Sequence, residues 1–106
     1  MRVMSEADSQ ALPPATFTFL VLSLRAQTEI QLGLMHFGDE AEEKPKPNLP
    51  TARHSIDLLA MLLEKTKGNL TLEERRLLEN SLTELRFRFV QISEELNQAA
   101  AQAQKA

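Results

Sequence analysis

Residues 61–74 read MLLEKTKGNLTLEE, and the Lys, Thr and Gly residues in this stretch are types that could bind phosphate. A phosphate-binding P-loop needs the pattern G-x-x-x-x-G-K-[ST] after a strand, whereas here one glycine, Gly68, follows a leucine-rich helical run. The K-T-G element of penicillin-binding enzymes is also absent, because Lys67 interrupts it and the chain has no S-x-x-K pattern. A turn between two helices explains the stretch better.

The same residues match the signals of a corner between helices. Gly68 suits the C′ position just past a helix end, because glycine enters the left-handed backbone region without steric cost. Lys65 and Lys67 fall in the last turn, where cations interact favourably with the helix dipole. Thr71 and Glu74 have the spacing of a capping box. We predict that Gly68, Thr71 and Glu74 form a structural corner.

The remaining reactive residues favour no catalytic or metal site. His54, Ser55 and Asp57 are the residue types of a hydrolytic triad, but side chains one to three positions apart on one helix do not face one another. His36 precedes the acidic run at 39–43, which could bind a divalent ion weakly. A solvated acidic loop is the commoner meaning of such a run. We predict no catalytic residue, no metal, no cofactor and no enzyme activity.

The composition excludes several classes of protein. With 106 residues, 42% hydrophobic and 25% charged, the chain is typical of one soluble domain. Its net charge of −3 argues against duplex DNA as a partner. The lack of cysteine fits a reducing cytoplasm. No apolar run approaches the length of a membrane span, and FTFLVLSL at 17–24 lacks the flanks of a signal peptide. We predict a cytoplasmic location without membrane contact.

Apolar periodicity predicts a first helix that is capped by Thr16 or Thr18, runs to about Phe37 and has Gly38 past its end. Its apolar residues form two arcs on roughly opposite sides, a pattern that normally means burial on both sides. One arc comprises Phe17, Leu20, Val21, Leu24, Leu32 and Met35. The other comprises Phe19, Leu22, Ala26, Ile30, Leu34 and Phe37.

Two further helices are predicted. The second begins after Asn48, with Pro50 tolerated in its first turn, and ends at the corner. The third spans about residues 72–97 and overhangs its neighbours by about two turns. Phe87 and Val90 lie opposite its main apolar seam. The seam has the alternating spacing of a coiled coil and comprises Leu78, Leu82, Leu85, Phe89, Ile92 and Leu96.

The predicted domain organisation follows from these elements. Residues 1–15 form a disordered N-terminal tail, and residues 16–98 form a single helical domain. The acidic, proline-rich loop at 39–48 interrupts that domain. Residues 99–106, AAAQAQKA, are low in complexity and form either a frayed helical extension or a disordered tail.

Three segments carry a family resemblance: TFTFLVLSLRAQTEIQLG at 16–33, IDLLAMLLEKTKGNLTLEE at 56–74 and LLENSLTELRFRFV at 77–90. They resemble a small bacterial family catalogued as domain of unknown function 1844, and the KTKGNLT block is the most specific part. Glu29 stands where a small apolar residue is expected, and Phe89 where the family often has tyrosine. The resemblance implies a small helical protein and brings no activity with it.

We therefore predict an all-α protein of three main helices, with a tight hairpin between the second and third, packed in an oligomeric helical bundle. Exposed apolar stripes usually mark an interface, so we expect a homo-oligomer, dimer or higher, that acts as a non-enzymatic interaction or scaffold module. An unidentified protein partner is a further possibility, and the three helices could also wrap one another more completely than a helical wheel shows. The predicted interface comprises Phe19, Leu22, Ile30, Phe87, Val90, Ile92 and Leu96.

The alternative function is weak nucleic-acid binding through the second and third helices. Their short glycine-containing turn is compatible with a helix-turn-helix. However, Arg75, Arg86 and Arg88 point in different directions around the third helix, and neighbouring glutamates dilute their charge. Nucleic acid is therefore the less favoured partner.

Overall fold

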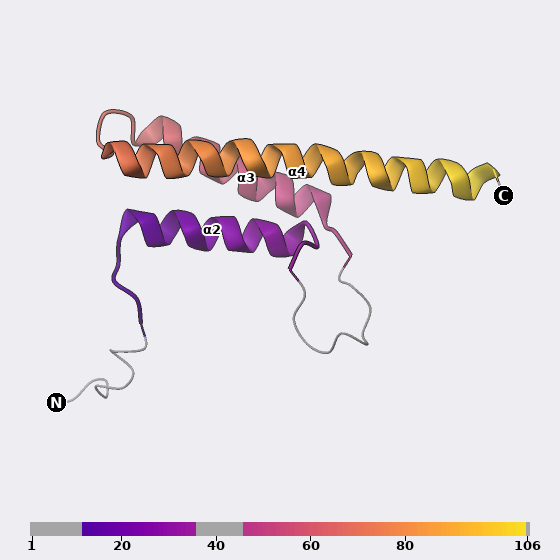
Figure 1. Ribbon diagram of the computed structural model, residues 1–106, viewed down its shortest axis with the longest axis horizontal. Coiled ribbons are helices and arrows are strands. Elements are labelled where there is room, and N and C mark those ends of the chain that lie inside the picture. The colour runs from indigo at the N-terminus through magenta and orange to yellow at the C-terminus, as the bar shows by residue number, and fades with distance from the viewer. Residues whose placement is uncertain (1–11, 36–45, 106) are drawn as a thin grey trace.

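The computed structural model describes residues 12–35 and 46–105, which form three helices and no strand (Figure 1). These are α2, Phe17–Gln31, α3, Leu49–Lys65, and α4, Leu72–Lys105. The predicted all-α class with a tight hairpin between the last two helices is confirmed. Most of the predicted N-terminal tail and acidic loop lies outside the described residues.

The helices pack with alternating direction along the chain. α2 and α4 are parallel to each other, and α3 is antiparallel to both (Figure 1). Each helix contacts both of the others. α4 has 34 residues against 17 in α3, so its C-terminal part projects past both neighbours (Figure 1).

Side-chain caps start the first two helices where the sequence predicted them. The Oγ1 atom of Thr16 accepts a hydrogen bond of 3.0 Å from the backbone N–H of Phe19, so Thr16 caps α2. The Oδ1 atom of Asn48 accepts a bond of 3.2 Å from the N–H of Thr51 and caps α3. Pro50 lies in the first turn of α3, where its missing N–H costs no helical hydrogen bond.

The end of α2 differs from the prediction. Gly33 adopts a φ of +79°, and the N–H groups of Gly33 and Leu34 donate back into the last turn at 3.0 and 2.9 Å. This is the Schellman pattern, which satisfies carbonyl groups at a helix end. The predicted end near Phe37 is therefore wrong, because Gly33 already terminates the helix. The predicted terminator, Gly38, lies outside the described residues.

The corner between α3 and α4 contains the left-handed glycine that the sequence predicted. Gly68 has a φ of +85°, and the N–H of Asn69 donates to the carbonyl oxygen of Thr66 at 2.9 Å. Since Thr66 is the C-cap of α3, the C′ residue is Lys67. Gly68 thus acts one position later than predicted, inside the turn that follows the helix end.

The capping box at the start of α4 is confirmed. The N–H of Glu74 donates to Thr71 Oγ1 at 3.1 Å, and the N–H of Thr71 donates to Glu74 Oε1 at 2.9 Å. The two residues therefore satisfy one another's free backbone donors at the helix start.

The core forms where the seam of α4 meets the inner sides of α2 and α3. The predicted seam faces inward as far as Ile92, which is only 8% exposed. Ile92 therefore belongs to the core of the single chain, which corrects its place among the predicted free interface residues. The buried apolar side chains are Val21, Leu32, Ala52, Ile56, Leu59, Leu78, Leu82, Leu85 and Ile92.

Three small polar residues that the sequence analysis missed are also buried: Thr28, Ser55 and Ser81. The Ser55 hydroxyl donates to Gln31 Oε1 at 2.6 Å and thereby joins α3 to α2. The Thr28 hydroxyl donates to the carbonyl oxygen of Leu24 at 2.7 Å. Hydroxyl groups with partners of this kind can be buried at little cost, and their small size lets the helices approach closely.

α4 is longer than predicted. The helix continues through Lys105, beyond the predicted end near Asn97. Alanine and glutamine are strong helix formers, which explains why the last turns stay helical without a neighbouring helix.

Candidate functional site

An apolar stripe runs along the outer side of α2, and we call it the α2 face. It comprises Phe19, Leu22, Ala26 and Ile30, which lie at spacings of three and four residues and therefore on one side of the helix. Phe19 and Leu22 are each 45% exposed and Ile30 is 42% exposed. From the opposite arc, Val21 and Leu32 are buried in the core and Phe17 and Leu24 pack against it, whereas Leu20 is exposed. Ala26, within the α2 face, is half-buried.

A polar cluster beside the α2 face positions α2 against α4. The Arg25 guanidinium contacts Glu29 Oε2 at 3.3 Å and donates to Ser81 Oγ at 3.4 Å. It also pairs with Glu84 of α4. Arg25 is one-quarter exposed, so this cluster lies at the edge of the interface between the helices. Glu29, which departs from the small apolar residue expected at its position, takes part in this cluster.

A hollow of about 370 Å³ lies between α3 and α4, and we call it the α3–α4 hollow. Its apolar lining comes from both helices, and its charged lining consists of two arginines and one aspartate. Such a combination of apolar floor and polar rim is typical of a binding groove. The lining residues are Arg53, Ile56, Asp57, Arg86, Phe89 and Val90.

The remaining predicted interface residues lie on α4. Phe87 is the most exposed of the large apolar side chains, at 65%, and lies three residues from Val90. Leu96 continues the core seam, but it is exposed. We call residues 93–105 the projecting segment, because every described side chain from Glu94 to Gln104 is exposed.

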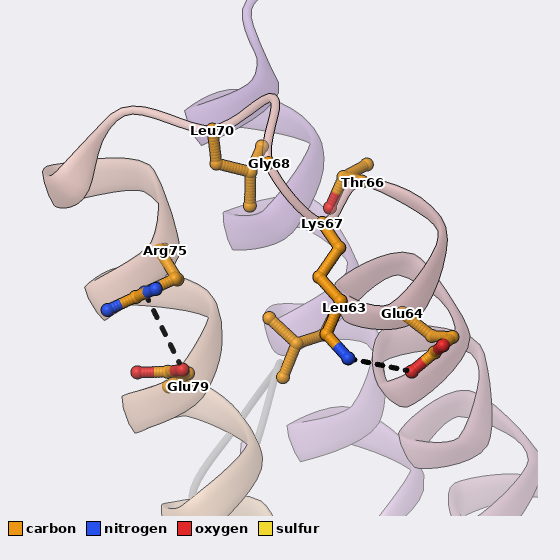
Figure 2. Close-up of a pocket in the computed structure, with 8 residues that line it drawn as sticks. All are labelled: Leu63, Glu64, Thr66, Lys67, Gly68, Leu70, Arg75 and Glu79. Atoms are coloured by element: carbon orange, nitrogen blue, oxygen red, sulfur yellow. Dashed lines mark ion pairs between the residues drawn. The ribbon is translucent and has the colours of Figure 1, made fainter.

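A second pocket, of about 310 Å³, lies at the corner between α3 and α4. Its lining includes Thr66, Lys67 and Gly68, whose residue types could bind phosphate. Figure 2 shows Lys67 paired with Glu64 and Arg75 paired with Glu79, each at 3.8 Å. Each cation thus has a carboxylate beside it, which disfavours an anion. The pocket is lined by Leu63, Glu64, Thr66, Lys67, Gly68, Leu70, Arg75 and Glu79.

The three residues of α3 with the types of a hydrolytic triad do not lie together as a catalytic triad. Ser55 is buried and bonded to Gln31, whereas His54 and Asp57 are exposed on α3. Among residues 12–35 and 46–105, no three histidine or acidic side chains gather as metal ligands. His36 and the acidic run at 39–43 lie outside these ranges.

The arginines of α4 make separate local contacts. Arg75 pairs with Glu79, Arg88 donates to Gln91 at 3.4 Å, and Arg86 lines the α3–α4 hollow. They form no continuous basic stripe of the kind that follows a phosphate backbone. None of the described helices is long and apolar enough to cross a membrane.

Comparison with known proteins identifies the family of the chain. Residues 14–91 match the family model described as a domain of unknown function, DUF1844, which confirms the resemblance seen in the sequence. The matched range contains α2, α3 and α4 as far as Gln91, so the projecting segment lies outside it. No curated protein and no solved structure matches the chain.

Proposed function

The chain belongs to the domain of unknown function 1844 family, and we propose that it is a non-enzymatic interaction module that associates with copies of itself. The α2 face carries this proposal. Its three large side chains are each more than two-fifths exposed along one side of a helix that buries Val21 and Thr28 against the rest of the chain. Large uncovered apolar stripes usually mark interfaces, because their burial removes apolar surface from water.

A second copy of the chain is the proposed occupant of the α2 face, because the order of its side chains is self-complementary. In an antiparallel pair of α2 helices, Phe19 faces Ile30 of the other copy, and Leu22 faces Ala26. Both pairs are centred within half a residue of each other, so one two-fold axis near Leu24 and Arg25 relates them. A symmetric dimer uses the same patch on both copies in this way.

The polar surroundings support the same occupant. Arg25 already pairs with Glu29 and Glu84, so the basic residue beside the α2 face is engaged within the chain. An apolar face without a free cation suits a protein surface better than a nucleic-acid backbone. We place the module in the cytoplasm, because proteins of this reducing compartment rarely contain disulfide bonds and the chain has no cysteine.

The test uses Leu22→Asp, with Gln27→Asp as the matched control. Both changes introduce one negative charge at an exposed position of α2, but Gln27 lies outside the α2 face. Light scattering across a concentration series measures the molar mass, and circular dichroism measures helix content. We expect an oligomeric wild type, a mass at least halved by Leu22→Asp, and no change with Gln27→Asp. A wild type that stays monomeric throughout would overturn the proposal.

Nucleic-acid binding is tested in the same samples. Fluorescence anisotropy with a short duplex DNA and a short single-stranded RNA, at low and at moderate salt, would reveal phosphate contacts as steeply salt-dependent binding. We expect no such binding at protein concentrations where the oligomer forms. Tight, salt-sensitive binding together with a monomeric protein would favour the nucleic-acid function instead.

A further inference from the structure

We propose that the projecting segment of α4 is a second self-association surface, which docks antiparallel onto α4 of another copy and places Leu96 in that copy's α3–α4 hollow. The inference rests on the proposed self-association but uses none of the residues of the α2 face. It assigns an occupant to the hollow and to the uncovered end of the longest helix.

The core seam of α4 continues into the projecting segment. Leu96 follows Ile92 at the spacing of the buried part of the seam, and Ala99 and Ala103 continue the same alternation. Within the bundle this seam is covered by α2 and α3. Beyond Ser93 the same seam is exposed in the described part of the chain.

The energetics of a lone helix favour such a cover. The part of α4 without a neighbour has a length at which isolated helices are only marginally stable in water, and most helix stability in proteins comes from packing of an apolar side. Alanines in the projecting segment allow a second helix to approach closely. A second helix along this seam therefore stabilises both partners.

Charge complementarity selects the α3–α4 hollow as the docking site. The charged lining of the hollow consists of Arg53, Arg86 and Asp57, so the two arginines outnumber the one aspartate beside the apolar lining. Next to Leu96, the projecting segment carries Glu94 and Glu95, and residues 93–104 contain no basic residue. An acidic stretch of helix with one large apolar side chain thus matches a hollow whose charged lining is net positive.

The spacing along α4 makes the contact reciprocal. If the two-fold axis passes near Ser93, Leu96 of one copy lies opposite Val90 of the other, because both are three residues from Ser93. Ala100 likewise lies opposite Arg86 and leaves room for its long side chain. At 3.6 residues per turn, these five residues fall within about one-third of the helix circumference. Two equal Leu96 contacts then form in one symmetric interface.

Two separate two-fold surfaces on one chain predict assembly beyond a dimer. Copies joined through the α2 face and through the projecting segment form either a closed tetramer or an open chain. A change in one surface alone should then leave dimers held together by the other.

The absence of cysteine permits a direct geometric test. Ser93→Cys places two thiols near the proposed axis, whereas Gln102→Cys places them about 27 Å apart along the paired helices. Mild oxidation of each full-length variant, followed by non-reducing electrophoresis, measures the cross-linked fraction. We expect most of the Ser93→Cys protein to cross-link, at least five times the fraction found for Gln102→Cys. Equal fractions would overturn the antiparallel arrangement.

Light scattering supplies the second test. We expect Leu96→Asp to lower the molar mass to that of a dimer and to remove the cross-link in a Ser93→Cys background, while Gln102→Asp changes neither. If the wild type is an oligomer that responds to Leu22→Asp but not to Leu96→Asp, the proposed function stands and this inference fails. If the wild type is monomeric, both fail.

Discussion

The guanidinium group of Arg25 on α2 pairs with the carboxylate of Glu84 on α4, 59 positions further along the chain. The same group contacts Glu29 and Ser81, so one side chain links three other residues at the interface between two helices that run in parallel. The planar guanidinium can donate in several directions at once, which a lysine ammonium does with less fixed geometry. Arg25 therefore joins α2 to α4 beside the apolar core.

We expect Arg25→Met to lower the free energy of unfolding by about 1 kcal/mol, because it removes a partly exposed ion pair and leaves Ser81 without that donor. Urea denaturation measures the change. Lys67→Met is the control, since the Lys67–Glu64 pair is almost fully solvated and should contribute close to nothing. An equal response of the two variants would show that Arg25 has no special part in docking α2.

Replacement of Gly68 tests the left-handed backbone at the corner. A Cβ atom there would meet nothing within 4 Å, so any cost comes from the φ of +85° and not from a clash. We expect Gly68→Val to destabilise the fold by about 1 kcal/mol or more, and Gly68→Asn to cost less, because asparagine tolerates this region better. Thermal unfolding measures both, and an unchanged melting temperature for Gly68→Val would contradict a left-handed Gly68.

Loss of the capping box should destabilise the start of α4. In Thr71→Ala the N–H of Glu74 loses the acceptor it has at 3.1 Å, and we expect a cost of about 1 kcal/mol in the free energy of unfolding. Thr71→Ser keeps the hydroxyl and should stay within a few tenths of a kcal/mol of the wild type. Denaturant unfolding of the pair isolates the cap, and identical losses in both variants would assign the effect to the lost methyl group instead.

Replacement of Phe87 tests whether this residue belongs to an interface or to the core of the chain. Because its side chain is mostly exposed, we expect Phe87→Asp to leave helix content unchanged and to weaken self-association, measured as a fall in molar mass at fixed concentration. Asn80→Asp, another added charge at an exposed position of α4, should have no effect. Unfolding of Phe87→Asp as a monomer would instead place Phe87 in the core of the chain.

The local signals in the sequence predicted the local structure well. Caps depend on contacts between residues three positions apart, so Thr16, Asn48 and the Thr71–Glu74 box could be predicted from spacing alone. The predicted end of α2 was wrong because two glycines, Gly33 and Gly38, both follow apolar residues. Helical periodicity does not distinguish which of them terminates a helix.

By itself, the sequence determined the helical class, the corner at Gly68 and the inward seam of α4, because each depends on periodicity or on neighbours within a turn. Only the tertiary structure decided which of the two apolar arcs of α2 is buried, since both arcs are apolar and a helical wheel cannot choose between them. It also decided that Ile92 lies inside the core while Leu96, one turn later, lies outside. The reason is physical: burial depends on where the neighbouring helices lie against α4, and that placement comes from packing between segments far apart in the chain.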